Sequence, residues 1–128
     1  MEIEWVRQHC LSLPNATEQI QWGDNLIFKI GGKMFATLPL EPAAPVFLSF
    51  KCAPEVFADL IERPKIIPAP YLSRAHWVSL ESDDALPRAE IERLLGEAHA
   101  LVFAKLPKKL QDKLRHPAKR KKTSRAKD

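Results

Sequence analysis

The chain has only two cysteines among 128 residues, and Cys10 and Cys52 stand far apart without a CxxC spacing. Each lies in an apolar segment, so we expect two buried, reduced thiols and neither a disulfide nor a catalytic nucleophile. Long apolar runs are also missing, since none approaches the ~20 residues that span a bilayer. The start, from Met1 to Glu4, lacks the basic and apolar stretches of a targeting peptide. These absences predict a cytoplasmic protein that does not contact a membrane.

Metal-binding, nucleotide-binding and catalytic motifs are absent as well. The four histidines show no HxH, HxxxH or HExxH spacing, and the sequence contains no GxGxxG, GxxxxGK[ST] or GxSxG pattern. We therefore expect no metal, no cofactor and no enzymatic activity. An enzyme remains a third hypothesis, which would require a pocket that gathers groups such as Asp24, Arg74 and His76.

Charge is divided unevenly along the chain. Residues 1–105 hold ten Lys and Arg against fourteen Asp and Glu, a net charge of −4, whereas residues 106–128 hold ten against two, a net charge of +8. The overall charge of +4 therefore describes neither part. The division predicts a folded domain over residues 1–106 and a basic, largely disordered tail over residues 107–128.

Apolar periodicity and turn residues predict the elements of the domain. Gly31 and Gly32 stand between two strand-like runs and predict a tight hairpin. We expect helices at 3–13, 54–61 and 87–106, strands at 18–22, 26–30, 33–38, 46–51 and 76–80, and irregular extended chain at 66–72. This order predicts a two-layer α+β fold with an antiparallel sheet, one face packed on helices and the other available.

Three segments carry a resemblance to a known family. They are WGD at 22–24 with GGKMFA at 31–36, FKCAPE at 50–55, and PAPYLSRAHWV at 68–78. In this order and spacing they resemble the MmcQ/YjbR family over residues 1–106. The resemblance implies an α-β(3)-α-β(2)-α arrangement similar to type III secretion chaperones, and members are commonly labelled DNA-binding. Many members carry a Ser-Tyr pair in the last helix, where this chain has Ala98-His99.

Several basic and aromatic residues are candidates for a nucleic-acid interface. Lys29 and Lys33 flank the glycine turn and, with Lys51 and Arg74, are candidates for phosphate contacts, although charged strand edges also serve to block sheet pairing. Trp22 and Trp77 are candidates for stacking on bases, with core packing as the alternative. In the tail, the candidates are Lys119, Arg120, Lys121 and Lys122, with a solubilising disordered terminus as the alternative.

Two functional hypotheses follow from these candidates. The first is a non-enzymatic nucleic-acid-binding protein, with DNA as the expected partner and affinity that is mainly electrostatic. The alternative is a protein- or peptide-binding module, or a homodimer, that uses the open face of the sheet.

Overall fold

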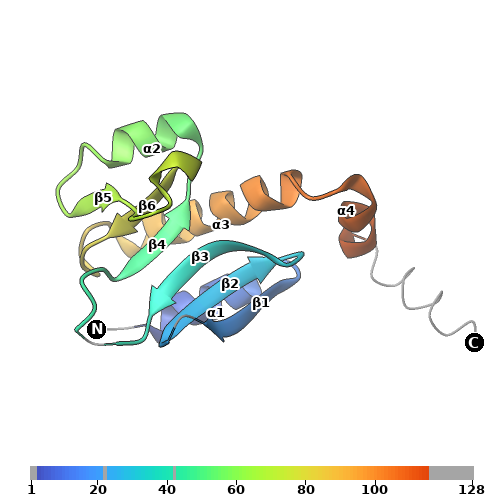
Figure 1. Ribbon diagram of the computed structural model, residues 1–128, viewed down its shortest axis with the longest axis horizontal. Coiled ribbons are helices and arrows are strands. Elements are labelled where there is room, and N and C mark those ends of the chain that lie inside the picture. The colour runs from blue at the N-terminus through green and yellow to red at the C-terminus, as the bar shows by residue number, and fades with distance from the viewer. Residues whose placement is uncertain (1–2, 22, 42, 116–128) are drawn as a thin grey trace, which may run out of the picture.

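The structure, a computed structural model, describes residues 3–21, 23–41 and 43–115 (Figure 1). The elements follow one another as α1 (Glu4–Ser12), β1 (Ala16–Gln21), β2 (Asn25–Ile30), β3 (Lys33–Pro39), β4 (Leu48–Lys51), α2 (Pro54–Leu60), β5 (Ile66–Pro68), the 3₁₀ helix η1 (Ser73–Ala75), β6 (Trp77–Leu80), α3 (Arg88–Ala104) and α4 (Lys108–Arg115). Among the described residues, no helix has the length and apolar content needed to cross a membrane.

The strands form one sheet in the order β1-β2-β3-β4-β6-β5, and all neighbours are antiparallel. The predicted α+β class and antiparallel pairing are confirmed. Four strands precede α2, one more than the order implied by the family resemblance. The interpretation of 66–72 as irregular chain is wrong at its start, because Ile66–Pro68 pairs with β6. Pro68 is tolerated there since β5 is an edge strand.

The helices α1 and α3 lie against the same face of the sheet, behind the strands in Figure 1. Helix α3 crosses β2, β3 and β4, and its apolar residues recur at three- and four-residue spacings. They pack with the sheet residues of this face, and the side chains that form the centre of the core are Phe28, Phe35, Phe50, Val78, Ile91, Leu95, Ala98 and Val102.

The other face of the sheet carries a row that runs across five strands. The register aligns Ile27, Thr37, Ser49, Ser79 and Ile67 in that order. The hydroxyls of Ser49 and Ser79 lie 2.7 Å apart and form a hydrogen bond between β4 and β6. Because Ile27 is 0% exposed and Ser79 only 1%, the centre of this face is less accessible than the sequence predicted.

The β2–β3 hairpin forms as predicted, with positive φ at Gly31 and Gly32. The turn of this hairpin also packs against Leu106, which follows α3, and Leu110 of α4. A Cβ placed on Gly31 would lie 2.6 Å from Cδ1 of Leu106 and 3.2 Å from Cδ2 of Leu110. The amide of Asn15 donates to the Leu114 carbonyl at 3.1 Å. These contacts hold α4 beside the hairpin.

The two glycines of the turn provide a matched test of this contact. Both have φ values that disfavour alanine, but a Cβ on Gly32 meets nothing within 4 Å. We expect Gly32→Ala to lower the free energy of unfolding by about 1 kcal/mol, from backbone strain alone. Gly31→Ala should lower it by about 1 kcal/mol more, because Leu106 and Leu110 must shift. Urea unfolding measures both, and equal losses would mean that the turn does not press on these leucines.

Candidate functional site

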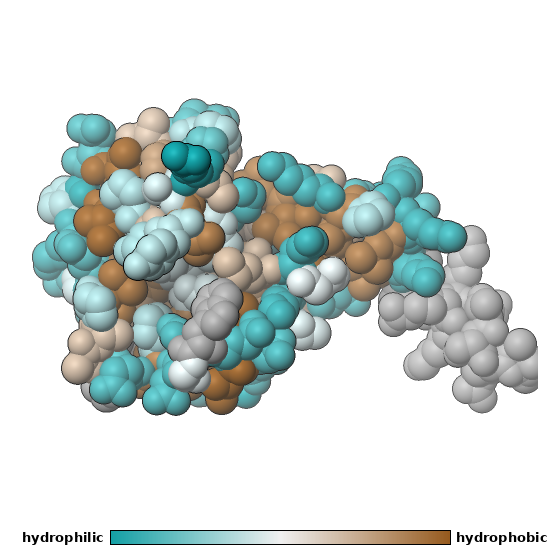
Figure 2. All heavy atoms as spheres, in the orientation of Figure 1, coloured by the Kyte–Doolittle hydropathy of each residue, from teal (hydrophilic) through white to brown (hydrophobic). Residues whose placement is uncertain are grey.

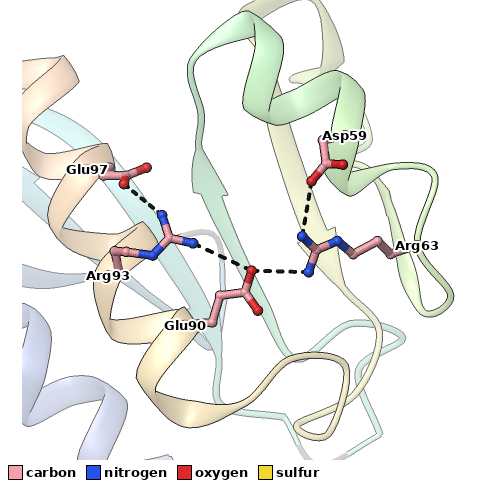
Figure 3. Close-up of polar contacts among 5 residues, drawn as sticks. All are labelled: Asp59, Arg63, Glu90, Arg93 and Glu97. Carbon is pink, nitrogen blue, oxygen red and sulfur yellow. Dashed lines mark hydrogen bonds and ion pairs between the residues drawn. The ribbon is translucent and has the colours of Figure 1, made fainter.

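Ion pairs hold the helices together on the side of the molecule where α2 meets α3. Arg63 binds Asp59 and Glu90, both at 3.1 Å, and thereby ties α2 to α3 (Figure 3). Arg93 continues the network along α3, at 3.5 Å from Glu90 and 2.9 Å from Glu97. Further ion pairs join Arg7 to Glu4 and Glu18, Lys65 to Asp84, and Arg88 to Glu92. These cations are neutralised within the fold.

The remaining described cations lack such partners. Within residues 3–21, 23–41 and 43–115, none of them has a carboxylate oxygen within 4.0 Å. They are Lys29, Lys33, Lys51, Arg74, Lys105, Lys108, Lys109, Lys113 and Arg115. Their positive charge is therefore available to a ligand.

Most of these unpaired cations lie at one end of the molecule. The hairpin turn, the C-terminal end of α3 and helix α4 meet there, as the contacts of Gly31 show and as can be followed in Figure 1. We call this region the basic end, and its residues are Lys33, Lys51, Lys105, Lys108, Lys109, Lys113 and Arg115. The sequence pointed to Lys33 and Lys51 but missed Lys105, which follows the last residue of α3 and belongs to no motif.

A cleft of 320 Å³ opens within the basic end. Its polar lining consists of Lys33, Lys51 and Lys105, and its apolar lining consists of Met34, Trp77, Val102 and Leu106. Strands β3 and β4 pair over only two residue pairs, Ala36 with Phe50 and Thr37 with Ser49. Beyond these pairs, Val102 of α3 and the residues Lys105 and Leu106 that follow the helix complete the wall of the cleft. Figure 2 shows hydrophobic surface between the sheet and α4, bordered by hydrophilic side chains.

Lys51 is held in place at the edge of this cleft. Its ammonium donates a hydrogen bond of 2.8 Å to the Ala75 carbonyl, which belongs to η1. Burial lowers the pKa of Lys51, and the positive charge of Lys105 lowers it further. The exposed Arg74 precedes Ala75, so the structure brings this candidate into the same neighbourhood as Lys51.

Two other candidates have a mainly structural environment. Lys29 donates to the side-chain oxygen of Gln19 across β1 and β2, at 3.0 Å. Trp77 is only 3% exposed and forms part of the cleft wall, so its ring is not available as a platform for a base. The candidates Trp22, Lys119, Arg120, Lys121 and Lys122 lie outside the described residues.

His76, named in the enzyme hypothesis, and His99 of α3 both have packing roles. The ring of His76 meets that of Phe57 edge to face, with the centroids 5.4 Å apart. His99 is buried, donates to the Pro14 carbonyl at 2.8 Å and packs against Phe35. Among the described residues, no group of three or more His, Cys, Asp or Glu side chains is placed to hold a metal ion.

Comparison with known proteins places the chain among similar sequences and folds. The family model described as YjbR matches residues 11–101. The chain is 27% identical over 111 residues to the uncharacterized protein YjbR of Escherichia coli strain K12, covering 84% of this chain and 92% of that protein. It is 29% identical over 92 residues to the uncharacterized protein YbdF of Escherichia coli O157:H7, covering 70% and 73% respectively.

Two solved structures are also similar to this chain. A Deinococcus radiodurans protein with the DUF419 domain superposes with a TM-score of 0.78 at 28% identity, covering 88% of this chain and 86% of that one. A Pseudomonas syringae protein superposes with a TM-score of 0.65 at 21% identity, covering 79% and 98%, and shows a similar fold.

The two thiols provide a test of the predicted burial. Cys10 and Cys52 are free and buried, and burial raises the pKa of each to about 12. Since only the thiolate is nucleophilic, we expect neither to react with Ellman's reagent at pH 8 in the native state, and both to react in urea. Rapid modification of native Cys52 would show that its thiol is accessible and activated.

Proposed function

The chain belongs to the YjbR family, and we propose that it is a cytoplasmic, non-enzymatic protein that binds nucleic acid, with DNA as the partner, through its basic end. The observation that carries the proposal is the separation of paired from unpaired cations. Arg63 and Arg93 are neutralised by carboxylates of α2 and α3, whereas Lys33, Lys51, Lys105 and the cations of α4 are not. Unpaired cations on one surface are what a polyanion requires.

The chemistry of the basic end favours backbone contacts over base recognition. Lysine ammoniums donate hydrogen bonds to phosphate oxygens and release condensed counterions, which gives affinity without sequence information. The hairpin contributes Lys33, the strand ends contribute Lys51, and the helix ends contribute Lys105 and the α4 cations. Because the Gly31 turn packs on Leu106 and Leu110, these cations are presented on one connected framework.

A charge-matched pair of variants tests the role of position. The test variant carries Lys33→Gln, Lys51→Gln and Lys105→Gln, and the control carries Lys65→Gln, Arg88→Gln and Arg93→Gln. Both lose three positive charges. We expect the test variant to bind duplex DNA about tenfold more weakly, because phosphate contacts are lost. Its log–log salt slope should be about 2.7 units shallower if each lysine meets one phosphate. Fluorescence anisotropy at several salt concentrations measures both.

The control variant distinguishes a defined DNA-binding site from an effect of net charge on DNA affinity. We expect the control variant to keep its salt slope, since its mutated cations are already paired with Asp84, Glu92, Glu90 and Glu97. Equal losses in the two variants would show that only net charge matters. Unchanged binding in the test variant would overturn the proposal for the basic end.

The sequence beyond α4 is expected to add to the same affinity. Lys119, Arg120, Lys121 and Lys122 follow α4 closely in the chain, so they are available to the same polyanion. We expect a chain that ends at Arg115 to keep measurable DNA binding with a shallower salt slope. Complete loss of binding in that chain would assign the affinity to the residues after 115 and none of it to the basic end.

The alternative is a protein or peptide partner on the second face of the sheet. Its support is smaller, because Ile27, Ser49 and Ser79 at the centre of that face are buried. One observation favours a partner at the rim instead, since Ile20 on the edge strand β1 is 60% exposed. Association that persists at high salt and is abolished by Ile20→Gln would support this alternative.

A further inference from the structure

The cleft within the basic end combines a cationic rim with an apolar lining. Phosphate binding requires only the cationic rim. Val102 and Leu106 are buried residues of the α3 end, and Met34 faces them from the start of β3. Together with Trp77 they make the lining mainly apolar. A phosphate backbone is strongly hydrated, so it gains nothing from contact with these four side chains. Because they line a cleft rather than the closed core, they favour a ligand with an apolar part.

The charged part of the cleft is entirely cationic. Its three charged lining residues are all lysines, and no hydroxyl, amide or carboxylate side chain is among the described residues that line it. Lys51 and Lys105 repel each other, which is one cause of the lowered pKa of Lys51. An anion between them would relieve this repulsion and accept charge-assisted hydrogen bonds. The lining therefore favours a ligand with a single anionic group over one with many neutral polar groups.

The size of the cleft limits the ligand further. At 320 Å³, it is at the lower end of the ~300–1,000 Å³ range of small-molecule sites. A nucleobase is a poor match, because its edges carry several donors and acceptors that these walls leave unpaired. An unbranched medium-chain carboxylate matches both the apolar lining and the lysines.

We propose that the cleft between β3, β4 and the C-terminal end of α3 binds a small amphipathic carboxylate. Its apolar part packs on Met34, Val102 and Leu106, and its carboxylate accepts hydrogen bonds from the lysines of the rim. The site shares Lys33, Lys51 and Lys105 with the proposed nucleic-acid surface. It is argued from the apolar lining, however, so it can be tested in the absence of nucleic acid.

Octanoate and octan-1-ol provide a matched pair of probes, since they share the chain length and differ in charge. Each is titrated, below the concentration at which octanoate forms micelles, into the full isotope-labelled chain and followed by amide and indole NMR shifts. We expect octanoate to shift the signals of Met34, Leu106 and the Trp77 indole. It should bind about tenfold more tightly than octan-1-ol, because hydrogen bonds to charged groups add to the apolar contact.

Two variants assign the charge selectivity to the cleft. Lys51→Gln should remove most of the preference for octanoate while octan-1-ol binds as before, which also shows that the cleft is intact. Lys65→Gln removes a lysine that is paired with Asp84 and should change neither titration. The proposal is overturned if octanoate shifts no signal, if its shifts centre on the separate cleft beside Pro14 and Phe103, or if octan-1-ol binds equally well.

Discussion

Burial of the apolar stripe of α3 against β2, β3 and β4 is the constraint on which the other features depend. This one contact covers the middle of the sheet, and it fixes both ends of α3 relative to the strands. At the N-terminal end, Glu90 accepts the ion pair that fastens α2. At the C-terminal end, Val102 and Leu106 line the wall of a cleft, and Leu106 also packs against the hairpin turn. A single helix thus joins the neutralised and the cationic parts of the molecule.

The distribution of charge has a physical basis in this arrangement. Around α2 and the first turns of α3, cations and carboxylates alternate at spacings that place them within reach of one another, as with Arg93 and Glu97. At the other end, α4 carries four cations and one carboxylate, Asp112, and the nearby strand ends bring Lys33 and Lys51. There are too few carboxylates for neutralisation, so the positive potential is directed outward.

Much of the fold was accessible from sequence because its signals are local. The glycine turn and the periodicity of 87–106 act within a few residues, and both predictions are confirmed. The features that were missed depend on distant partners. Ile66–Pro68 becomes a strand only because β6 lies beside it, and no local sequence pattern predicts this pairing. Likewise, Lys105 joins Lys33 and Lys51 only through the packing of α3. The burial of Trp77 also depends on tertiary contacts that its local sequence does not show.

The hydrogen bond between Ser49 and Ser79 has a consequence for how the sheet assembles. Strand β6 must insert between β4 and β5, although α2 and β5 intervene between β4 and β6 in sequence. In the native alignment the two hydroxyls satisfy each other in a buried position. Sliding β6 by two residues would keep the apolar side chains on the correct face but leave both hydroxyls without their partner, at a cost of about 1–3 kcal/mol each. A pair of small polar side chains therefore selects one alignment among several that hydrophobicity alone would accept.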